Sequence, residues 1–266
     1  MAKEFKYTLS SFQMIIIGFA GIILLGTLLL MLPFSTQSGT ATSFFDALFT
    51  ATSAVCVTGL VVQDTATYWS YFGQFVILLL IQIGGMGVVT VASAFALLSG
   101  RKLSFSQRNI MQEALSAPQI GGIVKLTRFV IIGTFLFEIL GALVMMPVFC
   151  KDFGIKGIWM AIFHSISAFC NAGFDLLGIN AKYSSLTNYI ANPVINITIM
   201  LLIVIGGIGF LTWSDILKNR HRISEYCMQS KVILSTTLAL ILIPTMYFFL
   251  IEFSDMPLKE RVFASF

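Results

Sequence analysis

The chain has 266 residues, of which 57% are hydrophobic and 11% charged, with a formal net charge of +4 at pH 7. Soluble globular domains carry roughly 25% charged residues, so this composition excludes that class and indicates an integral membrane protein within a lipid bilayer. The basic residues lie between apolar runs, where membrane topology places them, so they do not indicate a nucleic-acid partner. The four cysteines lack CxxC or Cys/His ligand spacing, so we expect no structural metal and no cofactor.

Residues 1–98 are predicted to form one unit of helix, short helix and helix. The first membrane helix is expected over about Gln13–Leu32, long enough to cross a hydrocarbon core of ~30 Å at ~1.5 Å per residue. Ser43 and Asp46 have capping-box spacing, with the Asp46 side chain reaching back, and so predict the start of the short helix. The second membrane helix is expected over Tyr71–Leu98.

The same order is predicted to recur in residues 126–213. The two units are separated by a polar, basic loop at 99–125, expected to be cytoplasmic and partly helical around Gln107–Leu115. The two membrane helices of the second unit are predicted over about Leu126–Phe149 and Asn188–Trp213. The short helix between them is predicted to begin at about Ile158.

A third unit is expected to begin in residues 232–266. It follows a second basic cytoplasmic loop, 214–231, and starts with a membrane helix over Val232–Ile251. The stretch Lys259–Phe266 matches Lys156–Phe163 at Lys, Ala and Phe. It is therefore predicted to be the first turns of a third short helix.

A semi-polar stretch that ends in glycine occurs twice, at Leu48–Leu60 and Ile162–Phe174, with an offset of 114 residues. Irregular backbone at membrane depth is tolerated only where protein buries it or where it lines a water-filled path. Neither stretch contains Lys or Arg, and backbone carbonyl oxygens replace the water shell of a hard cation. The predicted ion-binding residues are Val55, Cys56, Val57, Thr58, Gly59, Phe169, Cys170, Asn171, Ala172 and Gly173.

Two glycine-rich runs, 84–87 and 206–209, lie in the last helix of each unit. Small residues at this spacing let membrane helices approach closely, which is the interpretation we favour. A nucleotide-binding GxGxxG interpretation is excluded because no strand precedes these runs.

The distribution of basic residues predicts the orientation. If the N-terminus and the two long loops share one side, that side carries eleven Lys and Arg residues and the other side carries five. The positive-inside rule then places the N-terminus in the cytoplasm of a multi-pass plasma-membrane protein. The glycine-ended stretches face the outer side.

Four polar residues near these stretches carry further predictions. Glu138 lies inside a membrane helix, where an ionisable group is either functional or paired with a polar neighbour or backbone amide. His164 is expected to hydrogen-bond neighbouring helices rather than contact an ion. Asn171 could stiffen its loop, and Asp175 could either concentrate cations or act as an ordinary solvated turn acid.

The paired stretches 52–60 and 165–174 resemble the first two selectivity loops of the Trk/Ktr/HKT potassium transporters, most closely the Ktr-type (KtrB/NtpJ-like) membrane subunit of bacteria. The resemblance implies an all-α integral membrane fold with helix–pore loop–helix units around a pseudo-fourfold, potassium-channel-like pore. It makes Gly59 and Gly173 filter glycines and the preceding carbonyls potassium ligands. Potassium is then the transported ion, and sodium dependence stays open.

The same resemblance implies partners and a longer chain. The working complex would be a homodimer of membrane subunits on a cytoplasmic ring of nucleotide-binding regulatory subunits of the KtrA/TrkA type. The family has four loops, whereas two and the start of a third are found here, so we expect an N-terminal portion of a longer protein. The alternative from another class is a non-transporting assembly partner, or a polytopic membrane enzyme that uses His164 and Glu138. No residue set here indicates catalysis.

Overall fold

The computed structural model describes residues 10–98, 110–113, 122–179, 181–220 and 222–266, and these form helices joined by loops. The first half of the chain contains α1 (Ser11–Leu30), α2 (Phe44–Val55), α3 (Thr65–Tyr68), α4 (Tyr71–Met86) and α5 (Val88–Leu98). The second half contains α7 (Ile123–Phe153), α8 (Lys156–Phe169), α9 (Pro193–Ile208), α10 (Phe210–Asn219), α11 (Met228–Tyr247) and α12 (Leu258–Ser265). Short helical turns are η1 (Pro33–Ser35), η2 (Thr187–Tyr189), η3 (Ile223–Glu225) and η4 (Phe248–Glu252).

Three stretches in the described part of the chain are long and apolar enough to cross a membrane: Phe12–Leu30, Val124–Phe153 and Met228–Glu252. The pair α9 and α10 passes the same test together but is bent by 89°. These spans confirm the predicted all-helical, multi-pass membrane protein.

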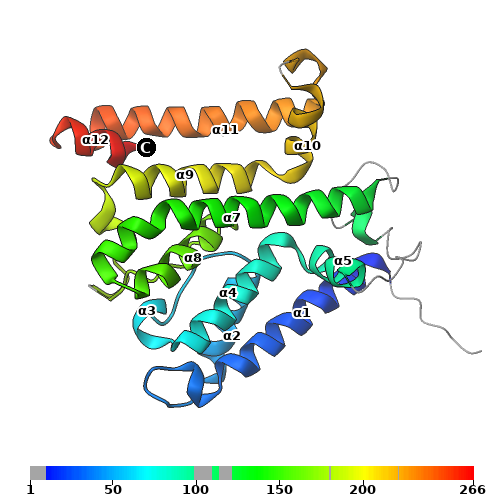
Figure 1. Ribbon diagram of the computed structural model, residues 1–266, viewed down its shortest axis with the longest axis vertical. Helices are drawn as coiled ribbons and strands as arrows, with labels where there is room; N and C mark the ends of the chain where they lie inside the picture. Colours follow the sequence, from blue (N-terminus) through cyan, green and yellow to red (C-terminus); the bar gives the residue numbers. More distant parts are fainter. Residues whose placement is uncertain (1–9, 99–109, 114–121, 180, 221) are drawn as a thin grey trace, which may run out of the picture.

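The helices pack in two sets with the same internal order (Figure 1). In the first set α1 contacts α2 and α4, and α2 contacts α4; in the second, α7 contacts α8 and α9, and α8 contacts α9. Contacts of α4 with α7 and α8, and of α5 with α7, join the sets. Each short helix, α2 or α8, is therefore enclosed by the two longer helices of its own set.

The short helices begin differently from each other. Ser43 caps α2 by accepting a hydrogen bond from the Asp46 amide at 3.2 Å, as predicted. The reciprocal half of the capping box is wrong, because the Asp46 carboxylate instead accepts from the Gln63 side chain at 3.4 Å. Helix α8 begins at Lys156, two residues earlier than predicted, directly after Gly154 ends α7 with φ +60°.

The last helix of each set is broken, which corrects the predicted single helices Tyr71–Leu98 and Asn188–Trp213. The breaks are at Gly87 (φ +82°) and Gly209 (φ +83°), a left-handed region that glycine adopts without the steric cost of a side chain. Hydropathy could not reveal them, because the apolar run continues across each glycine. Most of the predicted loop 99–125 and of its helix Gln107–Leu115 lies outside the described residues; residues 110–113 are helical.

Candidate functional site

The first loop, residues 56–60, follows the end of α2 at Val55. The backbone turns through two left-handed residues, Val57 (φ +57°) and Gly59 (φ +74°). The Thr58 amide donates back to the Ser53 carbonyl at 2.9 Å, which satisfies an acceptor that the end of the helix leaves open. The helix therefore stops and the chain returns as an extended segment.

The second loop, residues 170–174, repeats this geometry 114 residues later. Asn171 (φ +59°) and Gly173 (φ +73°) are its left-handed residues, and the Ala172 amide donates to the Ser167 carbonyl at 2.7 Å. Asparagine tolerates this backbone region better than most residues. Asn171 thus supports the loop through its own conformation, in line with the stiffening role predicted for it.

A serine on each short helix fixes the far end of its loop. Ser53 Oγ donates to the Leu60 carbonyl at 2.7 Å, and Ser167 Oγ donates to the Phe174 carbonyl at 2.6 Å. Both serines are buried, so water cannot replace these bonds. The Leu60 and Phe174 carbonyls, at the end of each loop, are held in one orientation as a result.

The two loops meet at their glycines. A Cβ built on Gly59 would lie 2.6 Å from the Ala172 carbonyl oxygen and 3.3 Å from Gly173 Cα. A Cβ built on Gly173 would lie 3.4 Å from Gly59 Cα. Residues far apart in sequence therefore form one junction, with an extended segment on either side.

The last carbonyl oxygen of each short helix lies directly against a glycine of the longer helix that follows. Cβ atoms at Gly84 and Gly206 would lie 2.1 and 1.9 Å from the carbonyl oxygens of Val55 and Phe169, respectively. Only glycine allows such an approach. The close helix approach predicted for the glycine-rich runs is thus made with the C-terminal ends of α2 and α8.

The ten predicted ion-binding residues all lie at this junction, with different exposures. Cys56, Thr58, Asn171 and Gly173 are exposed; Val57, Gly59 and Cys170 are half-buried; Val55, Phe169 and Ala172 are buried. The C-terminal ends of α2 and α8, which carry partial negative charge, lead directly into the two loops. With carbonyl oxygens and no Lys or Arg in either loop, the chemistry suits a cation.

A buried polar cluster lies behind the second loop. Gln82 Nε2 on α4 donates to both carboxylate oxygens of Glu138 on α7, at 2.9 and 3.2 Å. The Cys170 thiol lies 3.9 Å from Glu138 Oε1, and Ser165 Oγ donates to the Glu138 backbone carbonyl at 2.6 Å. Glu138 is therefore paired, which favours the structural interpretation. Sequence analysis missed Gln82, although an amide two residues before Gly84 in an apolar run was a usable signal.

His164 is held between α8 and the segment after the second loop. Its Nε2 accepts a hydrogen bond from the Leu176 amide at 3.2 Å, so the ring proton is on Nδ1, which lies 2.7 Å from the Met160 carbonyl. The imidazole is 4% exposed. This agrees with the hydrogen-bonding role predicted for it, although the bonds are to its own helix and the adjoining loop.

Asp64 is a second residue that sequence analysis missed. It is buried, and its carboxylate accepts hydrogen bonds from the Thr67 amide at 3.1 Å and hydroxyl at 2.7 Å. The Tyr183 amide of the second set also donates to it at 3.4 Å. Asp64 therefore ties the segments that follow the two loops. By contrast, Asp175 accepts from the nearby Leu177 amide at 2.9 Å, as a turn acid does.

Comparisons with known proteins identify a family and several similar sequences. Residues 3–255 match the TrkH family model, described as a cation transport protein. The chain is 44% identical over 265 residues to the potassium/sodium uptake protein NtpJ of Enterococcus hirae, covering 99% of this chain and 57% of the relative. It is 40% identical to the Ktr system potassium uptake protein B of Bacillus subtilis (91% and 53% covered) and 32% identical to that of Vibrio alginolyticus (90% and 52%). The chain thus spans about half the length of these relatives.

Proposed function

Since this chain belongs to the TrkH family of cation transport proteins, we propose that it carries potassium across the plasma membrane, as the pore-forming subunit of a Trk/Ktr-type uptake system. The relatives are named as potassium or potassium/sodium uptake proteins. Sodium is a candidate co-ion for this reason. Transport rather than catalysis is the proposed activity.

The observation that carries the proposal is the junction of Gly59 with Gly173. Two loops of the same backbone shape converge there from separate helix sets. We assign them to neighbouring quarters of one ion path, lined by the carbonyls from Val55 to Thr58 and from Phe169 to Ala172. Backbone carbonyl oxygens along such a path replace the hydration shell of potassium.

The domain boundaries follow from this assignment. Residues 1–98 and 126–213 are two helix–pore loop–helix units, with the N-terminus and loops 99–125 and 214–231 in the cytoplasm. Residues 232–266 begin a third unit. In support, α11 contacts α9 and α10 in the way that α7 contacts α4 and α5, and α12 contacts α11 as α8 contacts α7.

The name "Ktr system" implies that the relatives work with other components. We propose the same for this chain: a homodimer of membrane subunits resting on a cytoplasmic ring of nucleotide-binding regulatory subunits. The basic cytoplasmic loops are the proposed docking surface for the ring.

Potassium uptake in a host without its own potassium transporters tests the proposal. The 266-residue chain and the product of the whole reading frame are compared at low external potassium, each with and without Gly59→Ser and Gly173→Ser. We expect growth to be rescued by the chain that has both glycines and to be lost when either glycine is replaced by serine. Gly39→Ser is the control, because the Gly39 backbone dihedral φ is also positive (+71°) but a Cβ built there has nothing within 4 Å. Rescue that survives both loop variants would refute the assigned path.

A further inference from the structure

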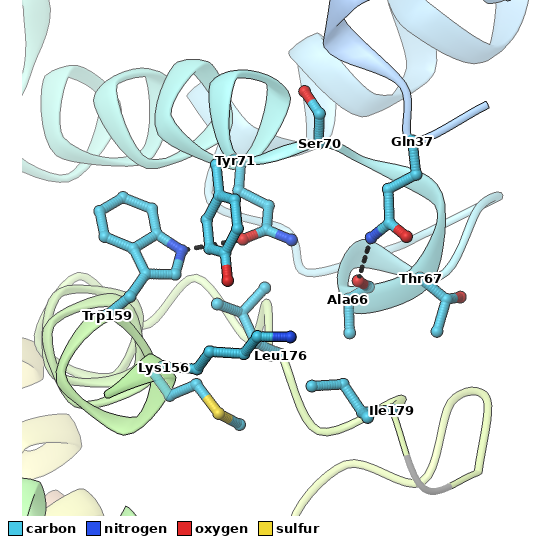
Figure 2. A pocket seen from close by; sticks show the side chains of 11 residues that line it. Gln37, Ala66, Thr67, Ser70, Tyr71, Lys156, Trp159, Leu176 and Ile179 are labelled. Atoms are coloured by element: carbon cyan, nitrogen blue, oxygen red, sulfur yellow. Dashed lines mark hydrogen bonds between the residues drawn. The ribbon is translucent and has the colours of Figure 1, made fainter. Parts of the chain in front are cut away.

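A cavity of about 520 Å³ lies between the two helix sets, where α4 and α8 begin. It is lined by residues of the segment before α2, of α3, α4 and α8, and of the segment after the second loop. None of the ten loop residues assigned to the ion path lines it. Figure 2 shows Tyr71 from α4 and Lys156 from α8 directed into the same space.

Most polar groups around the cavity are already bonded. Gln74 accepts from Trp159 Nε1 at 2.8 Å and donates to the Trp69 carbonyl at 3.1 Å. Gln37 donates to the Ala66 carbonyl at 2.8 Å. Thr67 and Ser70 also donate their hydroxyl protons, to Asp64 and to the Phe34 carbonyl.

Two donors are left over, the Lys156 ammonium and the Tyr71 hydroxyl. Neither makes a hydrogen bond or ion pair with another residue in the part of the chain that the structure describes. Lys156 is also the only charged side chain among the described residues that line the cavity. A free ammonium beside a free phenol favours an anion with acceptor oxygens. It disfavours a second potassium site, because the ammonium repels a cation.

The lining has the residue types of a membrane interface. Trp159 and Tyr71 line the cavity where α8 and α4 begin, and Trp and Tyr are enriched at interface depth. Tyr71, Phe75 and Leu79 are spaced four residues apart on α4 and are 58%, 47% and 45% exposed. They form one apolar stripe that runs from the cavity down the helix. An acyl chain can lie along this stripe while a polar group stays at its top.

We propose that this cavity binds the phosphate headgroup of an anionic membrane phospholipid. Lys156 neutralises the phosphate, Tyr71 donates to one of its oxygens, and Trp159 packs beside the glycerol region. An ammonium and a hydroxyl group recognise phosphate oxygens by charge-assisted hydrogen bonds of this kind. The bound lipid would join α4 of the first set to α8 of the second.

Fluorescence quenching tests the site, because Trp159 lines it. The whole-length protein is reconstituted into vesicles of phosphatidylcholine alone or mixed with phosphatidylglycerol, with bromine on the acyl chains of one lipid at a time. We expect about fivefold preferential quenching by brominated phosphatidylglycerol, which corresponds to the ~1 kcal/mol of one solvent-exposed ion pair. Lys156→Gln abolishes the preference, Tyr71→Phe reduces it, and Trp159→Phe removes the preferentially quenched emission.

Lys151→Gln is the matched control, because Lys151 is an exposed lysine near the end of α7 that does not line the cavity. Equal quenching by the two lipids, or a preference retained in Lys156→Gln, would overturn the proposal. Displacement of the lipid by inorganic phosphate would also overturn it, in favour of a soluble anion. Potassium uptake is measured separately on each variant, so failure of the lipid site does not bear on the transport proposal.

Discussion

The first and second loops differ in what lies behind them. In the first loop the Thr58 hydroxyl donates to Ser53 Oγ at 2.9 Å. The position 114 residues later is Ala172, which has no hydroxyl. The second loop instead has Glu138 and Gln82 behind Cys170, whereas Cys56, the counterpart of Cys170, is exposed. One backbone shape is therefore supported in two ways, and the support is specific to each position around the site.

The Gln82–Glu138 pair also distinguishes the junction between the first two sets from the next one. Gln82 precedes Gly84 by two residues, and the residue that precedes Gly206 by two is Val204. An amide that pairs with the following set is thus present in α4 and absent from the equivalent place in α9. The shared loop geometry does not require this cluster.

The largest effect on transport is expected at Gly59. Gly59→Ala combines a left-handed backbone, which costs ~1–2 kcal/mol for a residue with a side chain, with a Cβ 2.6 Å from the Ala172 carbonyl oxygen. Gly173→Ala has the same backbone cost, but its Cβ meets Gly59 Cα at an ordinary 3.4 Å. Potassium uptake should fall further in Gly59→Ala than in Gly173→Ala. Equal losses would mean that the clash is relieved by movement of the second loop, and Gly39→Ala reports the backbone cost alone.

The next effect is expected at the cluster behind the second loop. Gln82→Leu leaves the buried Glu138 carboxyl group without its amide donor, and an unsatisfied buried polar group costs ~1–3 kcal/mol. The double variant Gln82→Leu/Glu138→Leu removes the carboxyl group as well and should recover much of this loss. Thermal unfolding of the protein in detergent measures both. If the double variant is no more stable than Gln82→Leu, then the loss of stability does not come from an unsatisfied Glu138 side chain.

A smaller effect separates the two serines. Ser167→Ala removes one buried hydrogen bond, worth ~1 kcal/mol, whereas Ser53→Ala also leaves the Thr58 hydroxyl without the Ser53 Oγ acceptor. Ser53→Ala should therefore be the more destabilising, and the potassium preference over sodium should fall further in it. Thr58→Ala makes the first loop resemble the second and should bring the two serine variants closer together. If the two serine variants still differ in stability in the Thr58→Ala background, then the extra cost of Ser53→Ala does not come from the Thr58 hydroxyl.

The smallest effect is expected at Asp215, where α10 meets α11. Hydrogen bonds from the Ser230 side chain, the Cys227 amide and the Asn219 side chain hold the pKa of the Asp215 carboxyl below its ordinary value. The stability that it contributes is therefore present at neutral pH and is lost as the pH falls through the lowered pKa. Asp215→Asn should slightly reduce amide protection of the α10–α11 turn at neutral pH and make no difference in strong acid. If Asp215→Asn still reduces amide protection in strong acid, then the effect comes from packing and not from the Asp215 charge.

The sequence alone determined the helical membrane character and the place of both short helices. These follow from local chemistry: apolar runs of bilayer length, a serine cap before α2, and glycines where the helices must end. The loop conformation is also local, because Ser53 and Ser167 bond to carbonyls seven residues ahead in the same segment.

Only the tertiary structure decided which segments meet. Contact between Gly59 and Gly173, the pairing of Gln82 with Glu138, and the link from Asp64 to Tyr183 join residues between 56 and 119 positions apart. No periodicity encodes such partners, since each depends on how α4 packs against α7 and α8. The breaks at Gly87 and Gly209 belong to the same category, because a glycine inside an apolar run is compatible with either a straight or a broken helix until its neighbours are in place.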